Sequence, residues 1–175
     1  MPADNLSKAT RTFDIGALAF RTPTLQDAAQ MWQLASDSGV LDENSHYCYL
    51  IICRDFSETC VVAADGSEIV GFVTAYRPPQ RSSNIFVWQI GVSEAARGRG
   101  VAKRLLHELV ALPACRGVQV LEATVTPSNS ASRRLFQSFA ANLSVPCNIA
   151  AGFARELFSD GEHEEEELLR VGPFA

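Results

Sequence analysis

Apolar residues recur along this chain with two different periods, which predicts a protein built from both strands and helices. Runs rich in β-branched and aromatic residues indicate strands, because such side chains suit a pleated and half-buried surface. The segments with this pattern are 17–21, 59–64, 68–77, 85–92, 118–125, 143–149 and 165–171. Asp65-Gly66 joins two of them, and this pair favours the tight turn of a β-hairpin.

Apolar residues spaced three and four apart predict helices in the segments between these strands. The four helical segments are 25–34, 47–56, 100–112 and 129–141. Thr24 is a suitable N-cap for the first of them, and Asn44-Ser45 can cap the second. The apolar run of that second segment suits a buried strand nearly as well, so its assignment rests on the cap.

The predicted elements follow the order β-α-α-β-β-β-α-β-α-β-β. A long antiparallel meander followed by strand-helix-strand units predicts an α/β (α+β) fold, with a mixed, mostly antiparallel sheet of about seven strands and helices on both faces. A chain of 175 residues, 47% of them hydrophobic, is long enough for one well-buried core. Residues 1–16 lack a continuous apolar stretch, so we expect a flexible arm ahead of a domain over 17–175.

Charge and hydropathy exclude several classes of protein. The longest apolar run, residues 47–53, is far shorter than the roughly 20 residues that cross a bilayer. The net charge is −5, and six of the twenty acids lie within 160–167, which leaves fourteen acids against fifteen bases elsewhere. A chain without a basic face binds nucleic acid poorly, so small cationic partners are expected instead.

The five cysteines are odd in number and form no Cys-x-x-Cys pair, which favours free thiols over disulfides or a metal site. We interpret them as small buried side chains in a reducing cytoplasm. Neither a metal nor a membrane is therefore expected among the partners.

Residues 97–102, Arg-Gly-Arg-Gly-Val-Ala, lie between a predicted strand and a predicted helix and carry the clearest chemical signal. Glycines let backbone N–H groups converge, and the helix that follows adds its positive dipole end, so the segment suits a pyrophosphate. Two better-known phosphate-binding motifs do not fit. The dinucleotide-binding motif GxGxxG needs glycine where Lys103 stands, and the Walker loop needs Gly-Lys-Ser/Thr after four intervening residues. The segment matches R/Q-x-x-G-x-G/A at Arg97, Gly100 and Ala102, and so resembles the loop of the GCN5-related N-acetyltransferases, the GNAT family.

The family resemblance implies the GNAT fold and acetyl-CoA as cosubstrate. In that family the strand before the loop and the strand after the next helix splay apart, and the pantetheine arm lies between them. These strands are 85–92 and 118–125 here. The implied cofactor-binding residues are Ile90, Val92, Arg97, Gly98, Arg99, Gly100, Val101, Ala102, Asn129 and Ser132. Asn129 is also a suitable helix N-cap, and the two roles can coexist.

Five further segments narrow the resemblance to the L-2,4-diaminobutyrate acetyltransferases of ectoine biosynthesis, over most of residues 17–172. The segments are 20–24, 41–50, 55–63, 88–92 and 124–129. The resemblance implies a cytoplasmic homodimer for osmoprotection, which passes acetyl to the γ-amine by direct attack and yields N4-acetyl-L-2,4-diaminobutyrate. Diaminobutyrate carries two ammoniums and one carboxylate, so its pocket should be mainly anionic. The implied substrate-binding residues are Asp42, Asn44, Tyr47, Trp88, Thr124 and Glu166.

Catalysis needs a donor for the thioester oxygen and a base for the amine. A backbone N–H near Gly91 is the implied donor, although glycine in a strand also marks a bulge or a close backbone approach. An alkyl ammonium with a pKa near ~10.4 is about 0.04% neutral at pH 7, so a base or desolvation must help. The candidates for the base are Glu162, Glu164 to Glu167 and His163, which together form the late acidic run. In a β-strand, Glu165 and Glu167 would lie on one side and Glu166 on the other. Glu165 and Glu167 are the predicted catalytic residues, although the sequence does not choose among these acids.

Each of these residues also has a structural interpretation. Trp88 and Tyr47 can belong to the core, Asp42 can brace a loop, and a run of glutamates is usually a solvated surface. Phe136 stands where the family usually has the tyrosine that protonates the departing thiolate. A CoA thiol with a pKa near ~8.5 leaves readily, so water or another hydroxyl can serve. Alternative functions are an acetyltransferase for another amine, a CoA-binding sensor without turnover, and an anion-binding scaffold.

Overall fold

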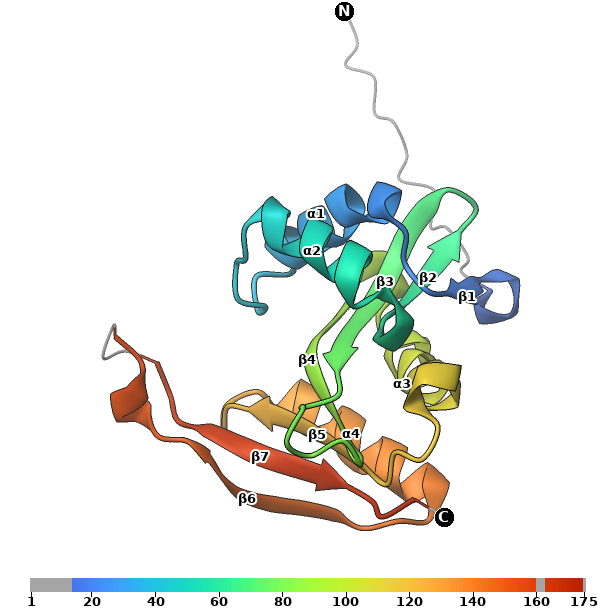
Figure 1. The fold of residues 1–175 in the computed structure, drawn as a ribbon. Coiled ribbons are helices and arrows are strands. Elements are labelled where there is room, and N and C mark those ends of the chain that lie inside the picture. Colours follow the sequence, from blue (N-terminus) through green and yellow to red (C-terminus); the bar gives the residue numbers. More distant parts are fainter. Residues whose placement is uncertain (1–13, 160–162, 175) are drawn as a thin grey trace, which may run out of the picture.

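A computed structural model describes residues 14–159 and 163–174 and shows one seven-stranded sheet with helices on both faces (Figure 1). The strands lie in the order β1-β2-β3-β4-β5-β7-β6. Helices α1 and α2 cover one face, and α3 and α4 cover the other. The predicted fold class is confirmed. The predicted arm, residues 1–16, falls mostly outside the described residues.

All seven predicted strands and all four predicted helices are present. The strands are β1 (Ala19–Arg21), β2 (Val61–Asp65), β3 (Glu68–Tyr76), β4 (Asn84–Val92), β5 (Val120–Val125), β6 (Cys147–Phe153) and β7 (Glu166–Val171). The helices are α1 (Ala28–Ser38), α2 (His46–Asp55), α3 (Val101–Ala111) and α4 (Ser130–Leu143).

The ambiguous segment 47–56 is a helix because its cap and its buried face agree. The Ser45 hydroxyl accepts a hydrogen bond from the Cys48 amide at 3.3 Å. Tyr49, Ile52 and Cys53 are buried at helical spacing against α1 and the sheet.

The sixth strand was predicted four residues too early, at 143–149. Leu143 is the last residue of α4 and packs on the core beneath that helix. The helix ends at Ser144, which adopts a left-handed conformation with φ of 56°. The strand therefore starts at Cys147, because the apolar pattern alone did not distinguish the end of a helix from the start of a strand.

The sheet opens where β4 passes β5. These two strands pair in parallel from Asn84–Val120 to Val87–Ala123, whereas every other neighbouring pair is antiparallel. β4 continues to Val92 without further pairing to β5. A register shift against β3 leaves Trp88 as an extra residue at this point, which is a β-bulge. The predicted divergence of these two strands is thus present.

Gly91 is a point of close approach rather than the bulge itself. A Cβ at this position would lie 2.9 Å from Leu34 Cδ2, 3.0 Å from Phe72 Cε1 and 3.2 Å from Leu41 Cδ1. Because glycine has no Cβ, α1 and the segment after it pack directly on β4. Residues 40–42 therefore lie beside the opening of the sheet.

Candidate functional site

A cleft of about 510 Å³ lies where β4 and β5 diverge. Its walls come from the segment after α1, the β4 strand, the end of β5 with the start of α4, and the segment between β6 and β7. The predicted site residues that line it are Asp42, Trp88, Ile90, Thr124, Asn129, Ser132 and Glu166. The structure thus brings together residues that are more than 120 positions apart in the sequence.

A second hollow, of about 310 Å³, lies over the glycine-rich loop. The predicted site residues that line it are Val92, Arg97, Gly98, Gly100, Val101 and Ala102. Ile90 lines the first cleft and Val92 the second, so β4 leads from one to the other. The path has the form that an elongated ligand with an anionic end would need.

The loop geometry suits an anion for local reasons. Gly98 and Gly100 have φ values of +71° and +84°, a region that other L residues rarely adopt. Gly100 is also the N-cap of α3, so the first amides of that helix and its positive dipole end face the hollow. Lys103 and Arg134, which the sequence did not single out, add cations to Arg97 around this hollow. Arg99 is exposed and is not part of its wall.

Of the acids within 160–167 that the structure describes, one lines the main cleft, and that acid is Glu166. It lies at the start of β7 and shares a side-chain hydrogen bond with Thr124 of β5. Burial raises the pKa of Glu166, and the nearby negative charges of Asp42 and Glu164 add to this effect. The Thr124 hydrogen bond opposes it, as does His163, whose Nε2 lies 3.9 Å from Glu166 Oε1.

The two predicted catalytic acids lie elsewhere. The Glu167 carboxylate accepts a hydrogen bond from Arg133 of α4, on the opposite face of the sheet from Glu166. Glu165 is exposed and lines neither hollow. The alternation of side chains in β7 therefore operates as expected, but the face that meets the cleft is that of Glu166. Glu162, another acid of this run, lies outside the described residues.

Asn44 and Tyr47 were predicted to touch the substrate, and neither lines the cleft. Tyr47 is 66% exposed on the outer side of α2. The Asn44 amide donates to the Asp42 carbonyl oxygen at 3.3 Å and therefore braces the segment that carries Asp42.

Gln89 supports the same segment and was not predicted. Its amide donates to the Asp42 carbonyl oxygen at 3.0 Å, and its own oxygen accepts from the Tyr49 hydroxyl at 2.7 Å. Gln89 is 5% exposed, so these bonds satisfy a buried polar side chain. A polar residue inside an otherwise apolar strand is the signal in the sequence that could have identified it.

Sequence reasoning also missed several other residues of the cleft wall. Phe153 reaches it from the end of β6 and Phe158 from the β6–β7 segment, and the Phe158 ring stacks on His163 with centroids 3.9 Å apart. Thr126 is also in the wall, beside Phe136 and Ser132, which the sequence had singled out.

The five cysteines are free thiols, and none lines the main cleft. Burial raises the pKa of Cys53 to about 11 and that of Cys60 to about 12. Thiols with such pKa values are poor nucleophiles at neutral pH. Burial also raises the pKa values of Cys48 and Cys147.

The part of the chain that the structure describes contains no cluster of three or more His, Cys, Asp or Glu side chains arranged to hold a metal ion. Across the same residues, every helix is too short or too polar to span a bilayer.

Comparisons with known proteins agree with this geometry. Residues 25–140 match the model of the acetyltransferase (GNAT) family. The chain is 46% identical to an L-2,4-diaminobutyric acid acetyltransferase from Marinococcus halophilus over 160 residues, which cover 91% of this chain and 92% of that protein. It is 48% identical to one from Halalkalibacterium halodurans over 151 residues, with 86% and 79% covered.

A solved structure is also similar over nearly its whole length. It is the diaminobutyrate acetyltransferase from Paenibacillus lautus, in complex with its substrate L-2,4-diaminobutyric acid and coenzyme A. It matches with a TM-score of 0.87 and 42% sequence identity, and the match covers 90% of this chain and 96% of that one.

Proposed function

The chain belongs to the acetyltransferase (GNAT) family, and from this premise we propose that it transfers the acetyl group of acetyl-CoA to L-2,4-diaminobutyrate. It is an acyltransferase whose cosubstrate is acetyl-CoA. The observation that carries this function is the pair of hollows joined along β4, one cationic and glycine-rich, the other lined by acids.

The cationic hollow suits the diphosphate of the cosubstrate. Arg97, Lys103 and Arg134 supply positive charge, and the amides that follow Gly100 supply donors. The pantetheine arm then runs along β4 past Ile90 and Val92, and the thioester arrives at the acidic cleft. A backbone N–H of this part of β4, next to Gly91, stabilises the oxyanion, a contribution of roughly 3 kcal/mol.

The amine is the harder partner to activate. Removing a proton from an ammonium of pKa near ~10.4 costs roughly 4.6 kcal/mol at pH 7. Glu166 is the described acid of residues 160–167 that lines the cleft, and its raised pKa makes it a better proton acceptor than a solvated glutamate. We assign the base to Glu166 and the binding of the α-ammonium to Asp42, with Trp88 and Thr124 as walls.

The reaction needs no acetyl-enzyme. Glu166 accepts one proton from the γ-ammonium, and the freed lone pair forms the C–N bond to the thioester carbon. Collapse of the intermediate breaks the C–S bond and releases the second nitrogen proton to solvent. Coenzyme A leaves as a thiolate that takes a proton from solvent or from a hydroxyl beside Phe136. The product is N4-acetyl-L-2,4-diaminobutyrate, which serves ectoine synthesis and osmoprotection.

We further propose a cytoplasmic homodimer whose domain spans residues 17–175, preceded by the arm of residues 1–16. The five free thiols support a reducing compartment. The edge strand β6 supports the dimer, since Ile149 and Phe153 on it are 43% and 51% exposed.

A thiol-release assay with acetyl-CoA and a panel of amines tests the function. Free CoA should appear fastest with L-2,4-diaminobutyrate and more slowly with ornithine and lysine, and mass and NMR analysis should place the acetyl on the γ-nitrogen. Acetyl-CoA binding without release for any amine would favour the sensor, and a stronger preference for another amine would assign a different substrate.

A further inference from the structure

A buried carboxylate in the central part of the sheet binds two arginines from distant parts of the chain. Glu122 of β5 is 2% exposed. Its Oε2 accepts from Arg81 Nη2 at 3.3 Å, and its Oε1 accepts from Arg170 Nε at 3.0 Å. One carboxylate between two guanidiniums leaves this group of three with a net charge of +1.

Arg81 carries that surplus charge into the substrate cleft. Among the described residues that line the cleft, it is the one arginine or lysine, and the same lining contains the acids Asp42 and Glu166. Its guanidinium bonds Glu122 through one nitrogen, and its side chain is 55% exposed. A guanidinium has five N–H donors, so most of them are available to a ligand in the cleft.

The loop between β3 and β4 holds Arg81 in place. The Arg81 amide donates to the Pro78 carbonyl oxygen at 2.9 Å, and the Asn84 amide donates to the Arg81 carbonyl oxygen at 2.8 Å. Arg77 braces the same loop by donating to the Ser82 carbonyl oxygen at 2.8 Å. A guanidinium on a braced loop and against a buried acid is preorganised, which lowers the entropic cost of binding.

The distance between the cationic and the acidic ends suits a short amino acid. Glu122 and Thr124 lie two residues apart on the same face of β5, which is about 7 Å at the rise of a strand. Glu166 bonds Thr124, so the acidic end lies one such step from Arg81 and Glu122. A four-carbon diamino acid is of this length, with its carboxylate at one end and its γ-amine at the other.

We propose that Arg81 binds the α-carboxylate of the substrate and thereby selects which of its two amines is acetylated. With the carboxylate at Arg81, the α-amine on the same carbon stays away from the opening between β4 and β5, and the γ-amine reaches Glu166. Glu122 is a positioning residue for Arg81. This inference rests on the proposed function and names the part of the site that recognises an amino acid rather than a simple diamine.

Two substrates that differ in one group test the proposal. 1,3-Diaminopropane is diaminobutyrate without its carboxylate, so the ratio of the two kcat/KM values measures carboxylate recognition. In Arg81→Gln this ratio should fall roughly 10- to 100-fold, the worth of a charge-assisted hydrogen bond, while kcat/KM for 1,3-diaminopropane changes little. Arg81→Lys, which keeps the charge, should recover part of the ratio.

The matched control is Arg54→Gln, since Arg54 is an exposed arginine of α2 that pairs with Asp55 and lines neither hollow. This variant should keep the wild-type ratio, and thermal melts of each variant check that it is folded. In Arg81→Gln, NMR of the diaminobutyrate product should also reveal acetylation at the α-nitrogen, which a general loss of stability would not produce.

The possible failures are distinguishable. If the wild-type protein acetylates diaminobutyrate in preference to 1,3-diaminopropane and Arg81→Gln keeps that preference, Arg81 does not bind the carboxylate, although the enzyme function stands. If the wild-type protein shows no preference between the two amines, carboxylate recognition itself is wrong. If neither amine is acetylated, the proposed function fails first.

Discussion

Glu166 lies in the cleft because side chains alternate across the sheet in β7. Its neighbour Glu167 points to the opposite face and pairs with Arg133 of α4. The register of β7 against β5 pairs Glu167 with Val125 and Leu168 with Thr124, which sets Glu166 at the open end of the cleft. A shift of one residue in this register would turn Glu166 away from the cleft and bring Glu167 to the cleft face.

The substitution Glu166→Gln tests the assignment of the base. We expect kcat to fall roughly 10²- to 10⁴-fold, the usual contribution of general base catalysis. Because burial raises the pKa of Glu166, wild-type activity should decline as the pH falls through a value above that of an ordinary glutamate. That acid limb of the kcat/KM profile should be absent in the variant.

Glu165→Gln is the control for this prediction, since Glu165 is the exposed neighbour and the charge change is the same. Steady-state assays from pH 5 to pH 9 should show near wild-type kinetics for it. A large loss in Glu165→Gln with normal activity in Glu166→Gln would reverse the assignment.

Gly100 matters for its backbone conformation, and its replacement by alanine gives a second prediction. The φ of +84° costs an L residue roughly 1–2 kcal/mol, which should lower the free energy of unfolding by that amount. The strain also distorts the loop, so the calorimetric Kd for acetyl-CoA should rise several-fold. The cleft for the amine should be unaffected.

Gly66 provides the matched control, because its φ is +62°, no atom lies within 4 Å of its missing Cβ, and it sits in the distant β2–β3 turn. Gly66→Ala should lose comparable stability and keep its acetyl-CoA affinity. Equal affinities in the two variants would indicate that the loop is a plain turn.

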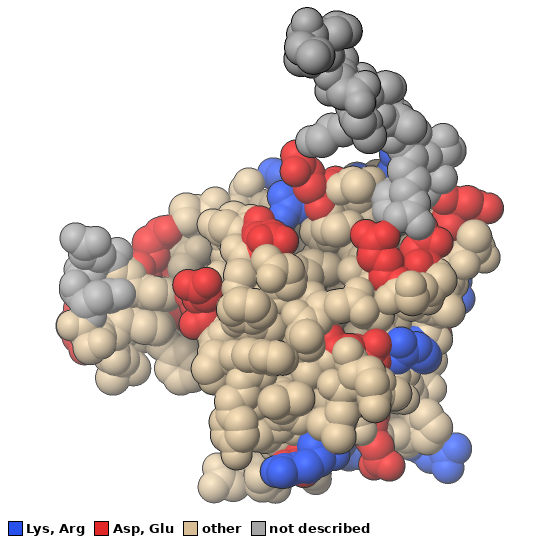
Figure 2. Space-filling view, turned by 90° about the horizontal axis from the view of Figure 1, so that it is seen from above, with Lys and Arg blue, Asp and Glu red and all other residues tan. Residues whose placement is uncertain are grey.

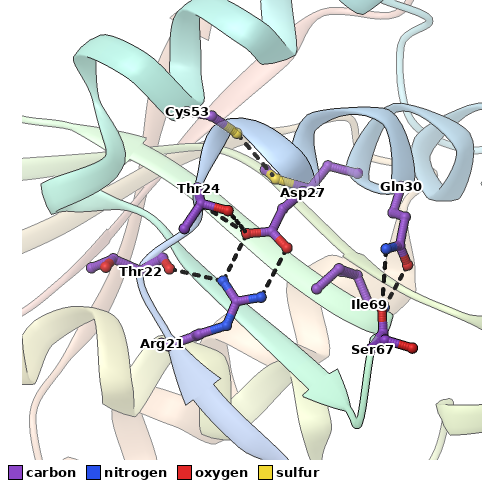
Figure 3. A network of polar contacts seen from close by, with 9 residues as sticks. Arg21, Thr22, Thr24, Asp27, Gln30, Cys53, Ser67 and Ile69 are labelled. Carbon is purple, nitrogen blue, oxygen red and sulfur yellow. Dashed lines mark hydrogen bonds and ion pairs between the residues drawn. The ribbon is translucent and has the colours of Figure 1, made fainter.

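At the scale of elements, the entry into α1 depends on one buried carboxylate. Asp27 accepts two hydrogen bonds from Arg21 of β1, at 2.7 and 2.8 Å, and bonds from the amide and hydroxyl of Thr24 (Figure 3). These bonds form a capping box ahead of α1 and tie the helix to the first strand. The segment after α1 carries Asp42, so this joint helps to position a wall of the cleft.

Asp27→Asn should lower the free energy of unfolding at pH 7 by about 2 kcal/mol. The hydrogen bond from Arg21 lowers the pKa of Asp27 to about 2, from an ordinary value of 3.8. A depressed pKa contributes stability above the ordinary value and loses it as the pH falls towards 2. The difference between wild type and variant should therefore shrink to about 1 kcal/mol near pH 3.

Urea titrations across this pH range measure the effect. Asp55→Asn is the control, because its ion pair with Arg54 is solvent-exposed and the substitution should leave the unfolding free energy unchanged within error. A pH-independent difference for Asp27→Asn would mean that packing, not charge, accounts for the loss.

At the scale of the whole molecule, the surface offers one edge of the sheet for association. The face in Figure 2 carries separate acidic groups and scattered basic ones, without a continuous basic patch. The β6 strand lies at the outer edge of the sheet, across from α1 and α2 (Figure 1). Six of its seven residues are exposed, several of them apolar, which is unusual for a strand that meets only water.

We expect analytical ultracentrifugation to give a dimer whose contact includes β6. Ile149→Lys places a charge in that contact and should shift the protein towards the monomer. Leu25→Lys is the control, since Leu25 is similarly exposed but lies ahead of α1 on another surface. A dimer that persists in Ile149→Lys would place the contact elsewhere, and a monomeric wild type would contradict the proposed homodimer.

The sequence predicted those features that depend on neighbouring residues. Periodicity gave the strands and helices, and Ser45 and Asn129 cap α2 and α4 as their positions suggested. The segment around Gly100 indicated the proposed anion site, because left-handed glycines and a following helix act within a few residues. The strand start that was misplaced furthest, at Leu143, lies where two apolar patterns run together.

The tertiary structure decided what depends on residues far apart in the chain. The alternation of side chains along a strand predicted that Glu166 and Glu167 lie on opposite faces of the sheet. Which of these faces lines the cleft depends on the pairing of β7 with β5. The residues next to Arg81 in the sequence do not indicate a role for it. Its proposed role depends on Glu122 of β5, which the fold brings within hydrogen-bond distance. Local spacing sets backbone conformation and periodicity, whereas the face, the depth and the charge around a side chain come from elements packed against it.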